Sequence, residues 1–364
     1  MGKIGIITFH RTTNFGSLLQ TYGLYKKIEL LGETPEIIDY RCDEIESREE
    51  LNNQIKFTVR ELAKRVLFYP TIKRKAEKLY AFLEKNTQMS NPVYADNIQQ
   101  LSYDKIIVGS DIVWGRDITN HDYNYFLEFC DEDEKKYAFS SSVGDYTVYD
   151  DDEYVGKLLK QFNKIAVREE KAQNWVRKLA DKEADLVCDP TMLLTIDEWE
   201  QVVRPVKYTE EYVLVYFDSP GSKCLQDAIN YAEKKKLKVF YINYGLHVKN
   251  TKTVKPTSLE EFLGLIKHAT TVFTASYHGM LFSLYYNKQF YFYTRAHSSR
   301  VLSLAKILGV QERLGDSGIV DTDIDYSIVN EKINHFRNKY VPTSACRSLP
   351  AMSSRYSATS FVHR

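Results

Sequence analysis

The sequence predicts an α/β protein with two domains, each built on a parallel sheet, that face each other across a cleft. Short apolar segments alternate with segments of helical periodicity along most of the 364 residues. Nearly every apolar segment ends in a polar or glycine-containing turn, which is the pattern of a doubly wound sheet. A charged stretch without clear periodicity, residues 197–211, separates two such series and indicates a domain junction.

This junction sets the predicted domain boundaries. We place an N-terminal domain at residues 1–200, with a helical insertion at about 43–90, and a C-terminal domain at residues 201–338. Residues 339–364 contain six serines, four basic residues and no acidic residue, and they lack apolar periodicity. Segments of this composition bury too little apolar surface to fold, so we expect a disordered tail.

The chain opens on a β-α-β pattern. Residues 3–9 are nearly all apolar, as expected of a buried parallel strand. Residues 16–31 repeat large apolar side chains at helical spacing and stop at Gly32, and a second strand is expected at 36–40. The start is therefore Rossmann-like, and so is the second series of elements. The first loop is not GxGxxG, so a dinucleotide-binding fingerprint is absent.

The predicted insertion is charged and helical, with apolar residues recurring every three or four positions between residues 51 and 66. Its basic cluster consists of Lys73, Arg74, Lys75 and Lys78. Such a cluster is typical of a solvated helix face, and the alternative is an anion-binding site.

Further strands follow in two groups. In the N-terminal domain we expect strands at 104–108, 137–142, 164–168 and 184–188. In the C-terminal domain we expect strands at 212–217, 238–243, 271–274 and from 289, with helices at 224–235, 258–268 and 328–337. The strands of each group should share one parallel sheet, and no strand should join both sheets.

Composition excludes several classes of function. The chain has 49 basic and 49 acidic side chains, which argues against a nucleic-acid partner. Its five cysteines form no CxxC pair and read as reduced thiols of the cytoplasm. No window approaches a membrane span, and the first apolar run is too short for a signal peptide. No His, Cys and Asp cluster has metal-ligand spacing, so we expect no metal. Tyrosine is abundant, at 27 residues, which suits sugar-binding clefts or reflects a compositional bias.

The segment at 274–293 carries the strongest functional signal. A strand end is followed by a turn with Ser276, Tyr277, His278 and Gly279, and then by an apolar helix. Gly279 allows a ligand to approach the backbone, and the N–H groups of a helix start favour a phosphate or carboxylate. His278 could transfer a proton near neutral pH. The alternative is a histidine that only caps the helix.

Six segments carry a family resemblance. ITFHRTTNFGSLLQTYGL, GSDIVW, YAFSSSVG, VREEKA, VCDPTMLL and TASYHGMLFSLYYNKQF occur in this order. Together they resemble the polysaccharide pyruvyl transferase family, from residue 3 to about residue 315. Ile112, Lys171 and Tyr277 depart from residues common in the family, which bears on substrate identity more than on fold.

The resemblance implies two Rossmann-like domains arranged as in B-type glycosyltransferases. It also implies transfer of a pyruvyl group from phosphoenolpyruvate, the donor substrate, to two sugar hydroxyls, forming a cyclic ketal without a cofactor. The acceptor would be a saccharide or a lipid-linked oligosaccharide of surface polysaccharide biosynthesis. We therefore expect a cytoplasmic enzyme that works near the inner face of the membrane.

The family's functional arginine and histidine match Arg168 and His278. Arg168 and Arg300 suit a charged donor, although each could instead form a domain-interface salt bridge. Ketal formation needs a group that gives and takes protons, which we assign to His278. Asp111 could orient the acceptor hydroxyls or the histidine, or else cap a helix. The remaining predicted substrate-binding residues are Asn14, Ser110, Ser276 and Gly279. Asp189 reads as a turn residue held by Pro190.

Two other functions remain open from the sequence. One is a nucleotide-sugar-dependent glycosyltransferase on the same scaffold, which would need an acidic residue near the second-domain turn to bind a ribose diol. The other is a non-catalytic sugar-binding or assembly protein, which would tolerate the loss of His278.

Overall fold

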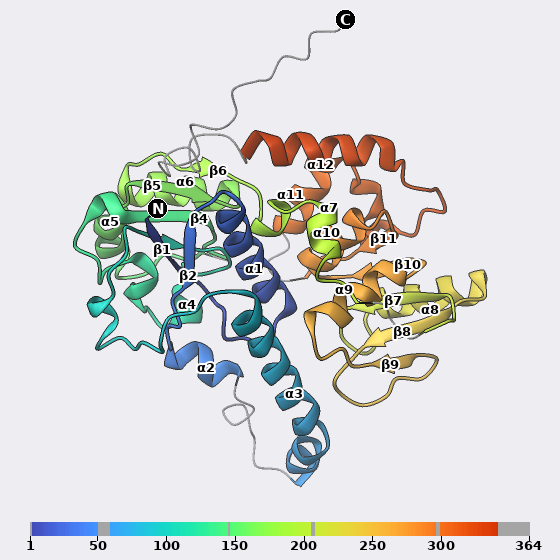
Figure 1. The fold of residues 1–364 in the computed structure, drawn as a ribbon. Helices are drawn as coiled ribbons and strands as arrows, with labels where there is room; N and C mark the ends of the chain where they lie inside the picture. The colour runs from blue at the N-terminus through green and yellow to red at the C-terminus, as the bar shows by residue number, and fades with distance from the viewer. Residues whose placement is uncertain (1, 50–58, 145, 205–207, 296–298, 341–364) are drawn as a thin grey trace, which may run out of the picture.

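Two parallel sheets organise the computed structural model of this chain, which describes residues 2–49, 59–144, 146–204, 208–295 and 299–340 (Figure 1). The first sheet has six strands in the order β2-β1-β3-β4-β5-β6. Their bounds are β1 Lys3–Ile7, β2 Thr34–Ile37, β3 Lys105–Val108, β4 Lys136–Ser141, β5 Lys164–Val167 and β6 Asp185–Leu186. Helices cover both faces, which explains why β1, β3 and β4 are runs of buried residues.

The helices of this first unit follow the strands in the expected alternation. They are α1 Phe15–Leu30, α2 Asp43–Glu49, α3 Val59–Asn86, α4 Arg116–Thr119, α5 Asp152–Lys160 and α6 Glu170–Ala180. Asn14 caps α1, because its side chain accepts a hydrogen bond from the N–H of Gly16 at 2.9 Å. α2 and α3 form the predicted helical insertion between the second and third strands.

The second sheet has five strands in the order β11-β10-β7-β8-β9. Their bounds are β7 Tyr212–Tyr216, β8 Lys238–Ile242, β9 Lys252–Val254, β10 Thr271–Thr274 and β11 Gln289–Phe292. The accompanying helices are α7 Ile196–Glu200, α8 Lys223–Lys235, α9 Leu259–His268, α10 Tyr277–Tyr285, α11 Ser299–Leu308 and α12 Tyr326–Tyr340. The predicted α/β fold with two separate parallel sheets is confirmed, since neither sheet contains a strand of the other.

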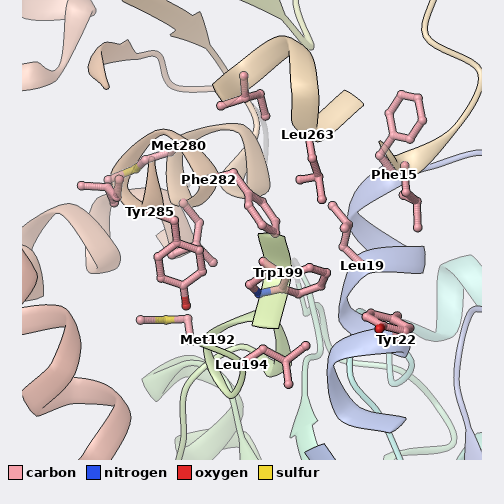
Figure 2. Close-up of a cluster of buried hydrophobic side chains, with 14 of the residues drawn as sticks. Phe15, Leu19, Tyr22, Met192, Leu194, Trp199, Leu263, Met280, Phe282 and Tyr285 are labelled. Carbon is pink, nitrogen blue, oxygen red and sulfur yellow. The ribbon is translucent and has the colours of Figure 1, made fainter. Parts of the chain in front are cut away.

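A cluster of large buried apolar side chains joins the two units (Figure 2). Phe15 of α1 stacks on Phe262 of α9, with ring centroids 4.5 Å apart. The buried Trp199 of α7 packs between Tyr22 of α1, at 5.7 Å, and Phe282 of α10, at 5.1 Å. The predicted junction is therefore part of a shared core, which holds the two sheets in a defined relation.

Part of the basic cluster in the insertion departs from the predicted solvated helix face. Lys75 of α3 is buried, and its Nζ lies 4.1 Å from the ring centroid of Phe15 and 4.4 Å from that of Tyr244. Lys78 extends to Glu261 of α9, with Nζ 3.5 Å from Oε1. Lys75 thus lies against the second unit instead of in solvent, because a lysine can place its apolar stem and its charge against aromatic rings. Lys73 and Arg74 of the same cluster are exposed, as predicted.

α12 returns from the second unit toward the first (Figure 1). Arg337 near its end donates from Nε to the carbonyl of Met192, at 2.8 Å. The helix reaches Tyr340, so the first two residues of the predicted disordered tail are helical. Residues 341–364, the rest of that tail, lie outside the described residues. Within the described ranges, no helix is long and apolar enough to cross a membrane.

Candidate active site

Polar side chains from both units meet at the carboxyl ends of the two sheets. Asp111 follows β3, Arg168 follows β5 and Asp189 follows β6 in the first sheet. His278 follows β10 at the start of α10, and Arg300 follows β11 at the start of α11. Open α/β sheets bind ligands at the carboxyl ends of their parallel strands, because the loops there take no part in the hydrogen bonding between strands.

Asp189 is the residue that both units share. Its Oδ2 accepts a hydrogen bond from Nη1 of Arg168 at 2.9 Å and lies 3.5 Å from Nε2 of His278. Its Oδ1 accepts from the backbone N–H of Thr191 at 3.0 Å and from the hydroxyl of Thr191 at 2.7 Å. Asp189 does cap the short 3₁₀ helix Pro190–Met192, as the turn prediction required. It also links Arg168 to His278, which that prediction did not include.

Burial and neighbouring charges have opposite effects on the pKa values of Asp189 and Arg168. Burial alone would raise the pKa of the Asp189 carboxyl, but His278 and then Arg168 hold that pKa well below its ordinary value. Burial would likewise lower the pKa of Arg168, yet the carboxylates of Asp189, Glu169 and Asp111 raise it above its ordinary value. The site therefore keeps a buried carboxylate and a buried guanidinium, both charged.

Arg168 has unused hydrogen-bonding capacity. Its side chain is buried, and in the described part of the chain neither Nε nor Nη2 has a hydrogen-bond partner. The nearest carboxylate oxygen to Nε belongs to Glu169 and lies 3.7 Å away, beyond hydrogen-bond distance. Buried donors of this kind are rare in folded proteins, and a bound anion would satisfy them.

Arg300 adds a second guanidinium from the opposite unit. Burial lowers its pKa, and so does the positive charge of Arg168, while Asp111 and Glu169 act in the other direction. The repulsion between the guanidinium groups of Arg168 and Arg300 lowers the free energy of unfolding. A ligand with two or more negative charges would remove that repulsion, so the arginine pair is suited to a compact polyanion.

Asp111 has an unusual backbone conformation. Its φ is 80°, in the left-handed region that few residues other than glycine adopt. Its Oδ2 accepts from the hydroxyl of Ser17 of α1 at 2.5 Å, and its Oδ1 accepts from the N–H of Ile112 at 2.9 Å. The N-cap of α4 is Gly115, so Asp111 does not cap that helix. Its strained backbone is of the kind found at functional sites.

His278 lies where α10 meets α1. Its side chain is 12% exposed, so it is neither free in solvent nor sealed in the core. Gly16 of α1 is in close contact with the imidazole, because a β-carbon at that position would overlap its Nδ1. Tyr277 lies beside Arg168, with its ring centroid 5.9 Å from the guanidinium carbon. Asp111, Arg168, Asp189, His278 and Arg300 are therefore grouped at one junction.

Four predicted binding residues also have structural roles of their own. Asn14 and Ser276 cap α1 and α10, each accepting a hydrogen bond from a backbone N–H of the first turn. A β-carbon at Gly279 would fall 2.5 Å from Oγ1 of Thr274, so this glycine permits the helix to pack on β10. Ser110 is fully buried, with its hydroxyl 3.4 Å from that of Ser140, so its side chain supports the turn from below.

Sequence reasoning missed three members of the site. The sequence indicates only a turn role for Asp189, because an aspartate that caps a turn and one that also pairs with a distant residue have the same local sequence. Glu169 could have been found from its position beside Arg168, and it accepts a hydrogen bond from the hydroxyl of Ser142 at 2.6 Å. Ser17 gave no signal, since its contact with Asp111 joins segments far apart in the chain. The described residues contain no group of three or more His, Cys, Asp or Glu side chains placed to hold a metal ion.

A comparison with protein families supports the family resemblance. The family model described as polysaccharide pyruvyl transferase matches residues 14–297. UDP-GlcNAc 2-epimerase from Methanocaldococcus jannaschii is 13% identical over 92% of this chain and 93% of that chain, with a TM-score of 0.49. UDP-GlcNAc 2-epimerase from Neisseria meningitidis, bound to UDP-GlcNAc, is 8% identical over 97% of this chain and 99% of that chain, with a TM-score of 0.48. No curated protein matches the chain.

Proposed function

This chain belongs to the polysaccharide pyruvyl transferase family, and we propose that it transfers a pyruvyl group from phosphoenolpyruvate to two hydroxyls of a saccharide. The product would be a cyclic ketal, with inorganic phosphate released. The acceptor would be a saccharide or a lipid-linked oligosaccharide on the cytoplasmic side of the membrane.

The observation that carries this proposal is the pairing of Arg168 with Arg300. Phosphoenolpyruvate bears a phosphate and a carboxylate on a three-carbon unit, so it needs cationic donors on more than one side. Arg168 offers two buried donors without partners in the described chain, and Arg300 approaches from the other unit. A donor bound there would also lie beside the N-termini of α1 and α10, which favour negative charge.

His278 would move the protons of the reaction. In the first step it gives a proton to the methylene carbon of phosphoenolpyruvate, which makes the neighbouring carbon electrophilic. One sugar hydroxyl then adds to that carbon and loses its proton, and the bond to phosphate breaks. A second hydroxyl adds and loses its proton to complete the ketal. His278 takes the proton of the first hydroxyl, passes it to the departing phosphate and then takes the proton of the second hydroxyl, so one donor and one diol give one ketal and one phosphate.

Asp189 and Asp111 would position the reacting groups. Asp189 lies against His278 and Arg168 at once, so it fixes the imidazole relative to the donor site. Asp111 is held by Ser17 and is close enough to both arginines to affect their pKa values. A carboxylate at that place can accept a hydrogen bond from an acceptor hydroxyl and raise its nucleophilicity.

The test combines donor binding with product formation. We expect phosphoenolpyruvate to raise the unfolding temperature of the purified protein, and UDP-sugars to leave it unchanged. With a saccharide acceptor, the wild type should release phosphate and produce the methyl resonance of a ketal in proton NMR. His278→Ala should abolish turnover and retain donor binding.

Arg168→Ala should weaken donor binding by about 1.5–3 kcal/mol, the value of a charge-assisted hydrogen bond. Arg168→Lys should restore only part of it, because an ammonium cannot form a two-pronged contact. Arg177→Ala removes an exposed ion pair with Glu183 and serves as the control. Stabilisation by UDP-sugars instead of phosphoenolpyruvate would replace this proposal with a glycosyltransferase function. Full turnover in His278→Ala would remove the histidine from the mechanism.

A further inference from the structure

A second feature of the site edge is an exposed aromatic ring held beside an arginine. Phe217 follows β7 directly, and 47% of its surface is exposed. β7 pairs with β10, with Tyr216 opposite Thr274, and the hydroxyl of Thr274 donates to the carbonyl of Tyr216 at 2.9 Å. Phe217 therefore lies beside the turn that leads from β10 to His278.

The backbone of Phe217 is held in a conformation that its side chain disfavours. Its φ is 61°, in the left-handed region, where a bulky residue is a genuine outlier. Two neighbours fix the segment: Arg295 donates from Nη1 to the carbonyl of Phe217 at 3.2 Å, and the hydroxyl of Tyr241 donates to the carbonyl of Asp218 at 2.9 Å. Conformations of this kind persist where the surroundings determine them, and they gather at functional sites.

Arg295 completes a platform of ring and guanidinium. Its guanidinium carbon lies 5.1 Å from the ring centroid of Phe217. Arg295 follows β11, and β10 lies between β11 and β7 in the sheet. The hydrogen bond from Arg295 to Phe217 thus crosses the end of β10, next to the turn that carries His278. Within the described residues, the only hydrogen bond of the Arg295 guanidinium is this one, which leaves other N–H groups for a ligand.

We propose that Phe217 and Arg295 form the subsite for the acceptor sugar, with the ring against the apolar face of a pyranose and the guanidinium donating to its hydroxyls. This inference rests on the proposed function, which requires a sugar with two free hydroxyls beside His278. An aromatic ring contributes binding through apolar contact with sugar C–H groups, and an adjacent polar group fixes the orientation. Nucleobases also stack on aromatic rings, so a nucleotide is the alternative ligand that the test must exclude.

The first test uses proton NMR and does not depend on turnover. Methyl β-D-galactopyranoside, methyl β-D-glucopyranoside and UMP are each titrated with the full-length protein. The ring current of Phe217 should shift the C–H protons on one sugar face upfield. Phe217→Asn should abolish these shifts without lowering the unfolding temperature, since asparagine tolerates the left-handed conformation. Tyr154→Ala, which removes another exposed ring, should leave them unchanged.

The second test uses the transfer reaction. Phe217→Asn and Arg295→Gln should each raise the acceptor KM about tenfold, the loss expected for one aromatic or charged contact. The KM for phosphoenolpyruvate should not change. Unaltered acceptor KM and glycoside shifts in Phe217→Asn would overturn the subsite while leaving the ketal-forming function intact. Upfield shifts of UMP without glycoside shifts would also overturn it. Glycoside shifts that vanish in Phe217→Asn, in a protein that forms no ketal, would support the subsite and contradict the proposed function.

Discussion

Gly16 and His278 come from different units of the fold, and they lie so close that Gly16 has no room for a side chain. A β-carbon on Gly16 would overlap Nδ1 and approach Cε1 of His278 within 2.8 Å. Gly16 is the second residue of α1, so the start of this helix forms one wall of the histidine's position. The orientation of the imidazole is therefore set by the first unit, although the residue belongs to the second.

We expect Gly16→Ala to lower kcat about 100-fold, because displacement of a catalytic group by an ångström costs about that much. Donor affinity should remain within about twofold, since the atoms that the new β-carbon meets first belong to His278 and both arginines are retained. Steady-state kinetics with donor titration measures both quantities. Gly245→Ala is a suitable control, because its β-carbon would meet only the side chain of Asn243, at 3.2 Å. Unchanged kcat in Gly16→Ala would show that the position of His278 is not critical.

Substitutions at Asp111 can separate the role of its left-handed backbone from the role of its negative charge. Asp111→Asn should fold as the wild type does, since asparagine adopts a φ near 80° more readily than most residues. Loss of the carboxylate should lower kcat about 100-fold if Asp111 acts on an acceptor hydroxyl. Ser17→Ala removes the hydrogen bond to Oδ2 and keeps the charge, so its effect should be smaller. Phosphate release assays compare the three proteins, and equal kcat values would assign Asp111 to structure alone.

Arg300→Gln should separate ligand binding from stability. Burial and the charge of Arg168 both lower the pKa of Arg300, so its positive charge opposes folding in the ligand-free protein. We expect the unfolding temperature without ligand to rise by about 2–4 °C for each kcal/mol of repulsion removed. The stabilisation by phosphoenolpyruvate should largely disappear. Thermal unfolding with and without donor measures both effects. A lower unfolding temperature without ligand would show that Arg300 has a stabilising partner.

The sheets could be predicted from sequence because their signal is local. Strands β1, β3, β5, β7, β8 and β10 are short apolar runs followed by polar turns, and this pattern predicts their grouping correctly. The short edge strand β9, with the sequence KTV, lacks that pattern and is not predicted. The environment of Lys75 could not be predicted in this way. Its charge suggested solvent, whereas Phe15 and Tyr244 reach it only after the two units have packed together. The hydrogen bond from Arg337 to the carbonyl of Met192 could not be predicted either, because the two residues are 145 positions apart in the sequence.

The site could be predicted only in part, for the same reason. His278 and Arg168 stand at strand ends, so their positions at the functional edge follow from topology. Asp189 pairs with Arg168 across the neighbouring strands β5 and β6, whereas its contact with His278 depends on how the two sheets face each other. A cap such as Asp189 satisfies its turn with one carboxylate oxygen, and the sequence does not reveal where the second oxygen points. A buried capping aspartate after a short edge strand therefore merits a search for a second partner.

The pairing of Asp189 should appear as a pH-dependent term in stability. The pKa of its carboxyl is held well below the ordinary value of about 3.9 in the folded protein, so folding favours the charged form. Its contribution to the free energy of unfolding is therefore complete above about pH 5 and is lost as the pH falls toward the folded pKa. Asp189→Asn lacks this term and also leaves Arg168 without its buried partner.

We expect Asp189→Asn to be less stable than the wild type by about 3–5 kcal/mol between pH 6 and pH 8, the cost of breaking a buried ion pair. The difference should narrow below about pH 4, where the wild type begins to lose the same term. Urea unfolding across this pH range measures it. Asp185→Asn, which alters a half-exposed pair with Lys164 in the neighbouring strand, should change stability by less than about 1 kcal/mol at every pH. A difference that stays constant from pH 8 to pH 3 would show that the charge of Asp189 is not what stabilises the junction.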